Sequence, residues 1–398
     1  MKRVVLFSGE YPVLSETFVW REAESLRQQG IALEVATLRA AKVPAKEVVP
    51  ARWVLFNNGV PGAILNSIKA LIATPARSMK LLNFAAKIAI GNQSNLKTKS
   101  KILFQGLCAL GIARVIKTFA PDWIHCHFAH APATYAMFVA KYLDIPWSFT
   151  GHANDLFQRR ILLEEKLNDA AGVGCISYWH KAFYTNISPN GTAKMRVIRC
   201  GVDIPDIANK ETNQTIKIIA VGRLIEKKGF HILLQACAGL DDIGELEINI
   251  IGDGPENERL HELARELPTN IKVNFLGALT HREILSMVAK SDLFVMPCID
   301  DKNGDRDGIP VSMMEAMAAG VPVLSGDLPA IRELIEDGVT GWIREAKPDS
   351  IEQAIRQISE SKIVLNEVAE QAHQWVTTEF STSVNTQRLI AMINGDRE

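Results

Sequence analysis

The chain has 398 residues, of which 47% are hydrophobic and 22% charged, so two domains are expected and a wholly disordered or fibrous protein is excluded. The net charge of −1 conceals an asymmetry, because residues 1–205 carry 25 Lys and Arg against 13 Asp and Glu, and residues 206–398 carry 19 against 32. A basic first half and an acidic second half predict two domains with different partners.

The first half alternates short apolar strands with helices. Residues 4–7 are a predicted strand that ends at Ser8-Gly9, a helix follows over about 15–29, and 33–38 is the next strand. Further strands are predicted at 123–127, 146–150, 173–177 and 195–199. Strand, glycine turn, helix and strand make the βαβ unit of a parallel sheet.

A polar segment over 200–215 is the predicted linker, and the same order of elements restarts after it. Strands are predicted at 216–221, 246–251, 273–276, 293–296 and 321–324. Helices are predicted at 229–238, 257–266, 281–290 and 310–319. In doubly wound sheets of this kind ligands bind beyond the carboxyl ends of the strands, so a site is expected among the strand-end turns.

Glycines and basic residues follow the first two strands of the second half. Arg223 and Lys228 lie close to a helix start, where they predict an anion site, although solvated side chains are about as common an outcome. Gly252-Asp253-Gly254-Pro255 is a second strand-end turn of the phosphate-loop type. Neither G-x-G-x-x-G nor a P-loop motif occurs, which counts against NAD enzymes and P-loop NTPases.

The densest polar segment is 297–342. Asp307 and Glu315 bracket Gly308-Ile309-Pro310-Val311, where the backbone N–H groups of a helix start would face a ligand. The alternative is an acidic loop before a core helix.

Two patterns in this loop imitate metal sites. Asn303, Asp305 and Asp307 resemble the first half of a calcium loop, but Met314 stands at its twelfth position. Asp305-Arg306-Asp307 resembles a D-x-D pair. We predict no metal, because nearby Arg and Lys side chains can neutralise phosphates instead.

Histidines gather at strand ends in the first half. His152 follows Gly151 and precedes Asp155 by three residues, which favours a functional role. His125, His127 and His130 form H-x-H-x-x-H, but we expect that no Glu or Cys completes a zinc set. We therefore predict that His127 lines a site and that no zinc is bound.

Taken together, these motifs resemble glycosyltransferase family 4. The resemblance covers nearly the whole chain and rests on Gly222-Arg223-Leu224 with Lys228-Gly229, Gly252-Asp253-Gly254-Pro255, Asp307 through Glu315-Ala316-Met317 with Gly320-Val321-Pro322-Val323, and Gly338-Val339-Thr340-Gly341-Trp342. Ser15-Glu16-Thr17-Phe18 and Thr150-Gly151-His152-Ala153-Asn154-Asp155 are similar to a subgroup that builds bacterial exopolysaccharides, including colanic-acid-type enzymes.

The resemblance implies an α/β fold of the GT-B type, with two Rossmann-like doubly wound domains facing across a cleft. The implied domains are an acceptor-binding domain over 1–205, a nucleotide-sugar-binding domain over 206–374, and a C-terminal helix over 375–398 that packs back on the first domain. The implied reaction is a retaining transfer of a hexose from a UDP- or GDP-linked sugar to a saccharide acceptor, which for this subgroup is polyprenyl-diphosphate-linked. No cofactor and no metal are expected.

The resemblance also implies roles for particular residues. The implied catalytic residues are Arg223, Lys228, Asp307 and His152. The implied donor-binding residues are Gly9, Gly222, Gly252, Gly254, Leu276, Gly277, Gly308, Ile309, Pro310, Val311 and Glu315. The implied acceptor-binding residues are Ser15, Glu16, Thr17, His127 and Asp155. Asp307 stands where the family usually has Glu, which leaves the identity of the sugar open.

Two other functions fit the same motifs. A nucleotide-sugar 2-epimerase of the GT-B fold would need no lipid acceptor and would leave the basic part of the chain unexplained. A non-catalytic nucleotide-sugar-binding subunit is favoured only by Asp307 in place of Glu.

The basic part of the chain is residues 48–121, which hold ten Lys and Arg and no Asp or Glu. Ile64, Ile68, Leu71 and Ile72 stand at helical spacing around Lys69. This pattern predicts amphipathic helices that dock on an anionic membrane surface, the alternative being a helical insertion with a solvated basic face. Nucleic acid is not expected, because no aromatic stacking platform accompanies the charge.

The sequence predicts neither export nor a membrane span. The first apolar run is much shorter than the core of a secretory signal, and the uncharged segment 102–113 is too short to cross a bilayer. Six cysteines without a C-x-x-C pair are typical of reduced thiols. We therefore expect a cytoplasmic protein that is peripheral at the inner face of the cell membrane.

Overall fold

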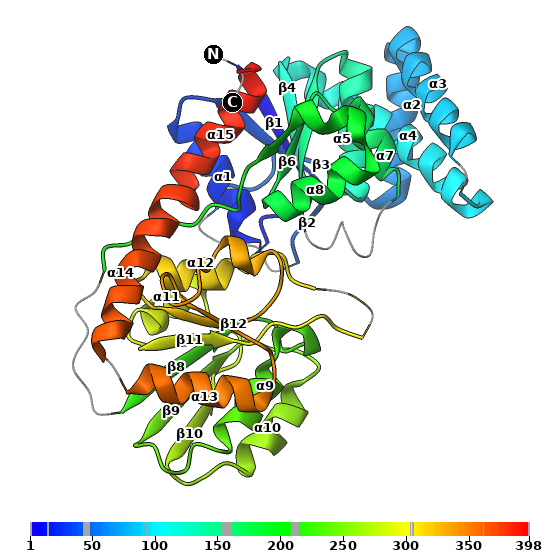
Figure 1. Ribbon diagram of the computed structural model, residues 1–398. Helices are drawn as coiled ribbons and strands as arrows, with labels where there is room; N and C mark the ends of the chain where they lie inside the picture. The colour runs from blue at the N-terminus through cyan, green and yellow to red at the C-terminus, as the bar shows by residue number, and fades with distance from the viewer. Residues whose placement is uncertain are drawn as a thin grey trace. The chain divides into compact units, whose positions relative to one another are not determined.

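The computed structural model describes residues 2–13, 16–42, 48–92, 94–152, 161–207, 215–302, 304, 306–360 and 362–396. The chain divides into two compact units, Met1–Arg199 with Asn385–Glu398 and Cys200–Val384 (Figure 1). Each unit has its own parallel sheet and its own core. The predicted class of two doubly wound α/β domains is therefore confirmed, while the boundaries 1–205, 206–374 and 375–398 stay predictions.

The first unit contains a seven-stranded parallel sheet in the order β3-β2-β1-β4-β5-β6-β7. The strands are β1 (Arg3–Tyr11), β2 (Ala32–Ala40), β3 (Trp53–Val54), β4 (Trp123–His127), β5 (Trp147–Gly151), β6 (Gly172–Cys175) and β7 (Met195–Val197). The short edge strand β3 was not predicted. The order reverses at β1, which pairs with both β2 and β4, and the ends of these strands form the crevice where ligands bind in such sheets.

Alternate residues of β1 enter two different cores, as the period of a strand dictates. Val5 and Phe7 join the core that contains α5, and Val4 and Leu6 join the core that contains α1 and the end of α15. All four side chains are fully buried, which explains the uninterrupted apolar run in the sequence. The helices are α1 (Thr17–Gln28), α2 (Gly59–Ala73), α3 (Pro75–Gly91), α4 (Leu96–Ile116), α5 (Ala131–Leu143), α7 (Leu163–Asp169), α8 (Tyr178–Ile187) and α15 (Thr382–Asn394).

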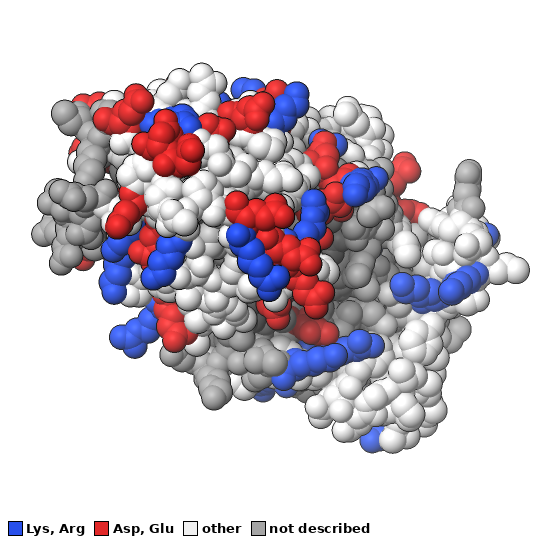
Figure 2. All heavy atoms as spheres, turned by 90° about the horizontal axis from the view of Figure 1, so that it is seen from below, with Lys and Arg blue, Asp and Glu red and all other residues white. Residues whose placement is uncertain are grey.

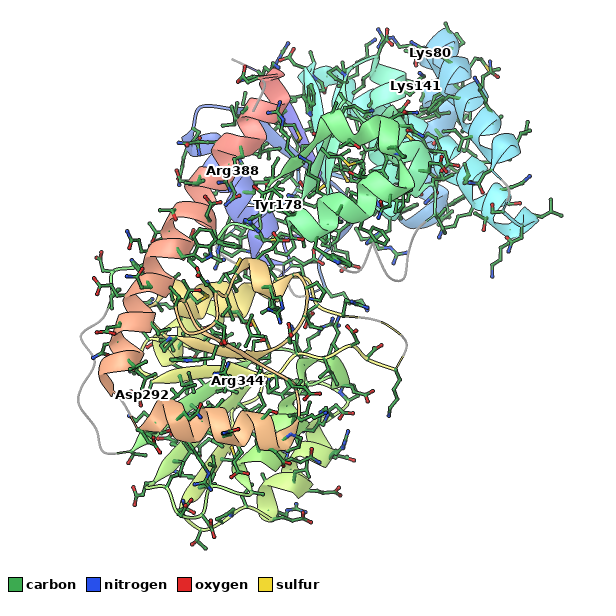
Figure 3. The ribbon with its side chains drawn as sticks, in the orientation of Figure 1. Lys80, Lys141, Tyr178, Asp292, Arg344 and Arg388 are labelled. Carbon is green, nitrogen blue, oxygen red and sulfur yellow. The ribbon has the colours of Figure 1, made fainter. Side chains whose placement is uncertain are left out.

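The basic part of the chain forms β3 and the helices α2, α3 and α4. α4 is in contact with α2, α3 and α5, so this insertion packs on the unit (Figure 1). Lys80 of α3 forms an ion pair with Asp144 at 2.6 Å, and Lys141 of α5 lies over the ring of Phe84, which fastens α3 to α5 (Figure 3). The segment Leu96–Phe119 is long and apolar enough to cross a membrane by length and composition, but 56% of its most apolar window is buried inside the fold.

The second unit contains a six-stranded parallel sheet in the order β10-β9-β8-β11-β12-β13. The strands are β8 (Ile216–Val221), β9 (Leu246–Ile251), β10 (Ile271–Phe275), β11 (Leu293–Met296), β12 (Val323–Gly326) and β13 (Trp342–Arg344). The edge strand β13 was not predicted. The order reverses at β8, between β9 and β11, so the turn after β8 is placed at the switch point of this sheet.

Helices cover both faces of the second sheet (Figure 1). α9 is in contact with α10 and α13, and α12 is in contact with α11 and α14. These helices are α9 (Phe230–Cys237), α10 (Asn257–Arg265), α11 (His281–Val288), α12 (Val311–Ala318), α13 (Pro348–Ser359) and α14 (Lys362–Glu379). A short 3-10 helix, η3 (Glu226–Lys228), connects the end of β8 to α9.

Candidate active site

The turns after β8, β9 and β10 interlock through their backbones. The Gly222 N–H donates to the Ile251 carbonyl at 3.0 Å, and the Gly252 N–H donates to the Gly277 carbonyl at 2.8 Å. Gly252 has φ of +140°, and a Cβ there would lie 1.8 Å from the Gly222 carbonyl oxygen. Only glycine fits such an approach. The structure thus brings together the predicted Gly222, Gly252 and Gly277 at one edge of the sheet.

The adjoining members of the predicted set lie in the same turns. A Cβ on Gly254 would lie 2.4 Å from the Leu224 carbonyl oxygen, and the Leu276 N–H donates to the Ile250 carbonyl at 3.0 Å. Arg223 is exposed at this edge and has no ion-pair partner among the described residues.

Asp307 lies among two lysines and a thiol. Lys228 Nζ is 3.0 Å from Asp307 Oδ2, and Lys227 Nζ is 3.5 Å from Oδ1. The Cys298 thiol donates to Oδ2 at 3.6 Å. The lysines end η3, Cys298 follows β11, and Asp307 precedes α12, so the cluster joins three strand-end segments. Lys227 and Cys298 were missed by the sequence analysis, although Lys227 is adjacent to a predicted site residue.

The charges of this cluster are fixed by mutual attraction. Burial alone would raise the pKa of Asp307, but Lys228 and Lys227 outweigh burial and hold that pKa below its usual range. Burial alone would lower the pKa of Lys228, but Asp307 outweighs it and raises that pKa. Burial, with a further contribution from Asp307, raises the pKa of the Cys298 thiol, which therefore stays protonated. The site holds an ionised carboxylate and two cations.

The start of α12 lies beside the end of β8. Pro310 is the N-cap and supplies no side-chain hydrogen bond, so N–H groups of the first turn are available to a ligand. The Ser312 hydroxyl donates to the Val221 carbonyl at 3.0 Å and fixes the helix start against the strand. Gly308 is half-buried and Ile309 is buried.

Glu315 lies one turn further along α12 and is only 8% exposed. Its Oε1 is 3.8 Å from Nε2 of His281, the first residue of α11. His281 was missed by the sequence analysis, although it follows the third strand-end turn and the N-cap Thr280. A buried carboxylate that faces a helix start can accept hydrogen bonds from ligand hydroxyls.

The first unit carries a second polar cluster at the ends of β4 and β5. His127 Nε2 is 3.0 Å from Glu22 Oε1, and His127 Nδ1 is 3.2 Å from His152 Nε2. His125 Nε2 lies 3.6 Å from the same Glu22 oxygen. The expectation that no Glu completes a histidine set is therefore wrong, because α1 brings Glu22 against the strand from far away in the sequence. Glu22, His125 and His127 are the one group in the described part of the chain with the geometry to hold a metal ion.

Burial and the neighbouring charges act in different directions on the groups of this second cluster. Burial lowers the pKa of His125 to about 4 and, with neighbouring histidines, lowers the pKa of His152 well below its usual range. Burial alone would raise the pKa of Glu22, but His127 and His125 outweigh it and lower that pKa. The ring of His152 lies between Phe18 and Phe128, at centroid distances of 4.6 and 4.7 Å.

A cavity of about 1030 Å³ opens at the ends of β1 and β2 in the same unit. Gly9 and Glu16, two predicted site residues, line it together with His130. Thr17 is buried as the first residue of α1. The predicted Ser15 and Asp155 lie outside the described residues, as do Asn303 and Asp305 of the metal-like patterns. The remaining lining residues include Arg39, Lys42, Val54, Phe56, Val60, Lys101, Phe104, Phe128 and Tyr135.

Two doubly wound units with parallel sheets, the second with glycine turns, lysines and a helix start at the strand ends, are the features of a glycosyltransferase of the GT-B class. Two family models match in succession, "Glycosyltransferase Family 4" over residues 15–205 and "Glycosyl transferases group 1" over 204–375. The chain belongs to the family 4 glycosyltransferases, as the sequence motifs predicted.

Relatives in bacterial polysaccharide synthesis support this assignment. The chain is 25% identical over 415 residues to the amylovoran biosynthesis glycosyltransferase AmsK of Erwinia amylovora, which covers 98% of this chain and 99% of AmsK. It is 32% identical over 209 residues to WcaL of Salmonella typhimurium, assigned to colanic acid biosynthesis as a glycosyltransferase. That match covers 50% of this chain and 51% of WcaL, so the chain spans about half the length of this relative.

Solved structures share the fold at low sequence identity. Anabaena HepE in complex with UDP and glucose has a TM-score of 0.68 and 16% identity, and the match covers 99% of both chains. TarM of S. aureus, solved with fondaparinux, α-GlcNAc-glycerol and UDP, has a TM-score of 0.70 and 12% identity, covering 99% of this chain and 100% of TarM. These likenesses confirm the GT-B fold.

Proposed function

We propose that this glycosyltransferase transfers a hexose, with retention, from a UDP- or GDP-linked sugar to a polyprenyl-diphosphate-linked saccharide in bacterial exopolysaccharide synthesis. The observation that carries the proposal is the buried group of Lys227, Lys228 and Asp307 beside the glycine turns of the second sheet. The names of AmsK and WcaL support the pathway, and the UDP complexes of HepE and TarM support a nucleotide-sugar donor.

The donor half of the reaction needs fixed positive charge. Breaking the bond between the sugar and the phosphate develops negative charge on the diphosphate, and Arg223 and Lys228 would stabilise it. Lys228 suits this role because Asp307 keeps it protonated. Asp307 would also accept hydrogen bonds from hydroxyl groups of the transferred sugar. Glu315 would accept hydrogen bonds from the hydroxyl groups of the ribose. With cations supplied by the chain, no metal is needed, and the leaving phosphate can itself take the proton of the acceptor.

The cavity of the first unit suits a diphosphate lipid. Arg39 and Lys101 line it as cations, while Phe56 and Phe104 supply apolar surface. A diphosphate head group needs the cations, and the first isoprene units need the apolar wall. Glu16, which also lines this cavity, suits saccharide hydroxyls. The acceptor would therefore be a saccharide carried on a lipid diphosphate.

The outer helices would hold the enzyme at the membrane. α2 buries the small residues Ala63, Ser67 and Ala70, and exposes Leu65, Ile68 and Ile72. The exposed apolar residues of α2, α3 and α4 include Leu65 (53%), Ile68 (47%), Ile72 (79%), Met79 (51%), Ile90 (77%) and Leu96 (82%). Figure 2 shows blue basic side chains on an otherwise largely uncharged surface at the right, where these helices lie. Apolar side chains among basic ones suit the interface of an anionic bilayer, which supports a peripheral position at the inner face of the cell membrane.

Release of nucleoside diphosphate by the purified chain tests this function. A panel of UDP- and GDP-sugars is offered with and without a polyprenyl-diphosphate saccharide, and the lipid product is analysed for anomeric configuration. We expect lipid-dependent release from one donor with retention, and a loss of about 10²–10³ in rate for Arg223→Ala. The control is Arg259→Ala, an exposed residue of the same unit that pairs with Glu256.

Other outcomes would overturn the proposal. Isomerisation or hydrolysis of the donor without a lipid acceptor would identify an epimerase. Donor binding without any turnover would identify a binding subunit. An inverted product would exclude the retaining mechanism.

A further inference from the structure

Two adjacent lysines contact different oxygens of Asp307 in the second unit. Lys227 Nζ lies 3.5 Å from Oδ1, and Lys228 Nζ lies 3.0 Å from Oδ2. Both lysine side chains are largely buried, with 9% and 13% of their surface exposed. One cation balances one carboxylate, so the second lysine gives this group a net positive charge. The proposed function uses Lys228 and Asp307 but gives no role to Lys227.

Lys228 reaches Asp307 along the glycine turn that follows β8. A Cβ on Gly222 would lie 3.5 Å from Lys228 Cε, so the stem of this lysine packs against the turn. The Gly222 N–H donates to the Ile251 carbonyl at the end of β9, which joins this turn to the next one. The ammonium group of Lys228 therefore lies beside the glycine turns of the sheet edge.

Lys227 is directed instead to the segment that carries Asp307. Its Nζ lies 3.5 Å from the carbonyl oxygen of Arg306, the residue directly before Asp307. Its own carbonyl accepts a hydrogen bond from the Ile299 N–H at 3.0 Å. Lys227 thus connects η3 to two points of the segment between β11 and α12, and it holds Asp307 from the side away from Gly222.

A bound diphosphate changes the charges around Asp307. Burial raises the pKa of this carboxyl group, but Lys228 and Lys227 outweigh burial. The groups that act on Asp307 are these two lysines and the Cys298 thiol, and Arg223 acts on Lys228. A diphosphate that binds Lys228 adds negative charge, which opposes the ionised form of Asp307. Lys227 contacts the other carboxylate oxygen and supplies a compensating charge in the complex.

We propose that Lys227 is a positioning residue that holds Asp307 in place as an ionised acceptor for a sugar hydroxyl, so that Lys228 is left to bind the diphosphate of the donor. The proposal rests on the proposed function, which assigns Asp307 to the sugar and Lys228 to the diphosphate. An ionised carboxylate only accepts hydrogen bonds, so it fixes the direction of its bonds with sugar hydroxyls. All three residues belong to the second unit.

The ionisation of Asp307 is measured directly on the full-length chain labelled with ¹³C at the side-chain carboxyl groups of aspartate. The signal is assigned with Asp307→Glu, which keeps the charge, and is followed from about pH 8 to about pH 4 with and without UDP or GDP. We expect Asp307 to stay ionised at neutral pH in the nucleotide complex. Uptake of a proton by Asp307 when UDP or GDP binds near neutral pH would overturn the proposal, and this measurement needs no lysine variant.

Lys227→Met removes the second cation and tests its role. We expect the Asp307 signal to titrate at a higher pH than in wild type, and nucleotide binding to take up as much as about one additional proton. Calorimetry in two buffers with different ionisation enthalpies measures this uptake, and comparison with wild type removes the contribution of the nucleotide's own phosphate. Lys227→Arg keeps a positive charge and should behave like wild type.

Lys302→Met is the matched control for Lys227→Met. Lys302 pairs with Glu226 of the same short helix η3 at 3.3 Å, but its side chain is 85% exposed. This variant should leave the titration of Asp307 and the proton uptake unchanged. Equal titration of Asp307 in Lys227→Met and Lys302→Met would overturn the proposal.

Binding and turnover separate the roles of the two lysines. Lys227→Met should lower kcat by up to about 10²-fold, because Asp307 loses its fixed position. Lys228→Met should lower the affinity for UDP or GDP at least about 10-fold more than Lys227→Met does, because it removes a charged hydrogen bond to the ligand. The reverse order of affinities would show that Lys227 binds the diphosphate itself, and it would overturn the proposal.

These readouts also separate the proposal from the proposed function. If the wild-type chain binds neither UDP nor GDP, the proposed function fails, while the titration of Asp307 in the free enzyme still decides whether Lys227 holds it ionised. If turnover is normal and Lys227→Met leaves Asp307 unchanged, only the role of Lys227 fails.

Discussion

Lys228 Nζ lies 3.0 Å from Asp307 Oδ2, and the two side chains are only 13% and 14% exposed. A pair this deeply buried keeps both charges because each raises the cost of neutralising the other. Removing one partner leaves an uncompensated charge, which typically costs about 3–5 kcal/mol. The same lysine is the cation proposed for the diphosphate, so Asp307 stands next to the position that a phosphate would take.

Asp307→Asn should therefore destabilise the free enzyme, and added nucleotide should stabilise this variant strongly. We expect the free energy of unfolding to fall by about 3–5 kcal/mol at neutral pH, and UDP or GDP to recover part of it by supplying the missing negative charge. Urea unfolding with and without nucleotide measures both effects. The control is Asp327→Asn, which breaks an exposed pair with Arg332 and should cost no more than about 1 kcal/mol. Equal losses in the two variants would contradict the prediction.

This pair also fixes a pH dependence. The lowered pKa of Asp307 means that its contribution to stability is present above the ordinary carboxyl range and is lost as pH falls through the lowered value. The raised pKa of Lys228 means that its contribution is present below the ordinary lysine range and is lost as pH rises through the raised value. The difference in stability between wild type and Asp307→Asn should thus be constant across the neutral range and shrink at both extremes.

Gly252→Ala should disrupt the interlocked turns after β8, β9 and β10. A Cβ at this position would lie 1.8 Å from the Gly222 carbonyl oxygen, and φ of +140° is itself unfavourable for alanine. We expect a loss of at least about 2 kcal/mol of stability together with weaker nucleotide binding. Gly244→Ala is the matched control, because a Cβ there meets no atom within 4 Å. Thermal unfolding and a nucleotide titration of both variants test this prediction. Equal stability and equal nucleotide affinity of the two variants would refute it.

The sequence predicted the local features of the fold. The fully buried residues of β1 follow from an uninterrupted apolar run, and Gly222, Gly252 and Gly277 could be placed at strand ends because each directly follows a predicted strand. Family membership followed from the same turns. These inferences needed only spacing along the chain.

Contacts between distant residues could not be predicted in this way. The contact of Glu22 with His127 depends on the side on which α1 packs and on the pairing of β1 with β4. The contact of Lys227 with Asp307 depends on how the loop before α12 returns to η3. The outward direction of Ile72 is decided by the small residues of α2 that face the unit. Helical periodicity alone does not tell which face is buried.

Ile72→Glu should weaken attachment to membranes without disturbing the fold. Ile72 is 79% exposed on α2, so a charged replacement should change stability by less than about 0.5 kcal/mol while adding a negative charge to a basic surface. We expect less protein to float with anionic phospholipid vesicles, and no change with neutral ones, where binding is already weak. Val339→Glu in the second unit, where Val339 is 41% exposed, is the control. Equal flotation of the two variants would count against docking through α2.

His180→Phe should make the stability of the enzyme less sensitive to acid. His180 is fully buried, its ring nitrogens have no hydrogen-bond partner among the described residues, and burial lowers its pKa to about 3. In the unfolded chain the same group takes up a proton near its ordinary pKa of about 6.5. Between these two values the unfolded state binds more protons than the folded one, so His180 makes stability fall as pH falls, by up to about 1.4 kcal/mol per pH unit. Phenylalanine removes this dependence and fills a similar volume, so stability near pH 7.5 should change little. Urea unfolding at a series of pH values from about 7.5 to 4.5 measures the slopes, and parallel curves for wild type and variant would show that His180 is already protonated in the folded enzyme.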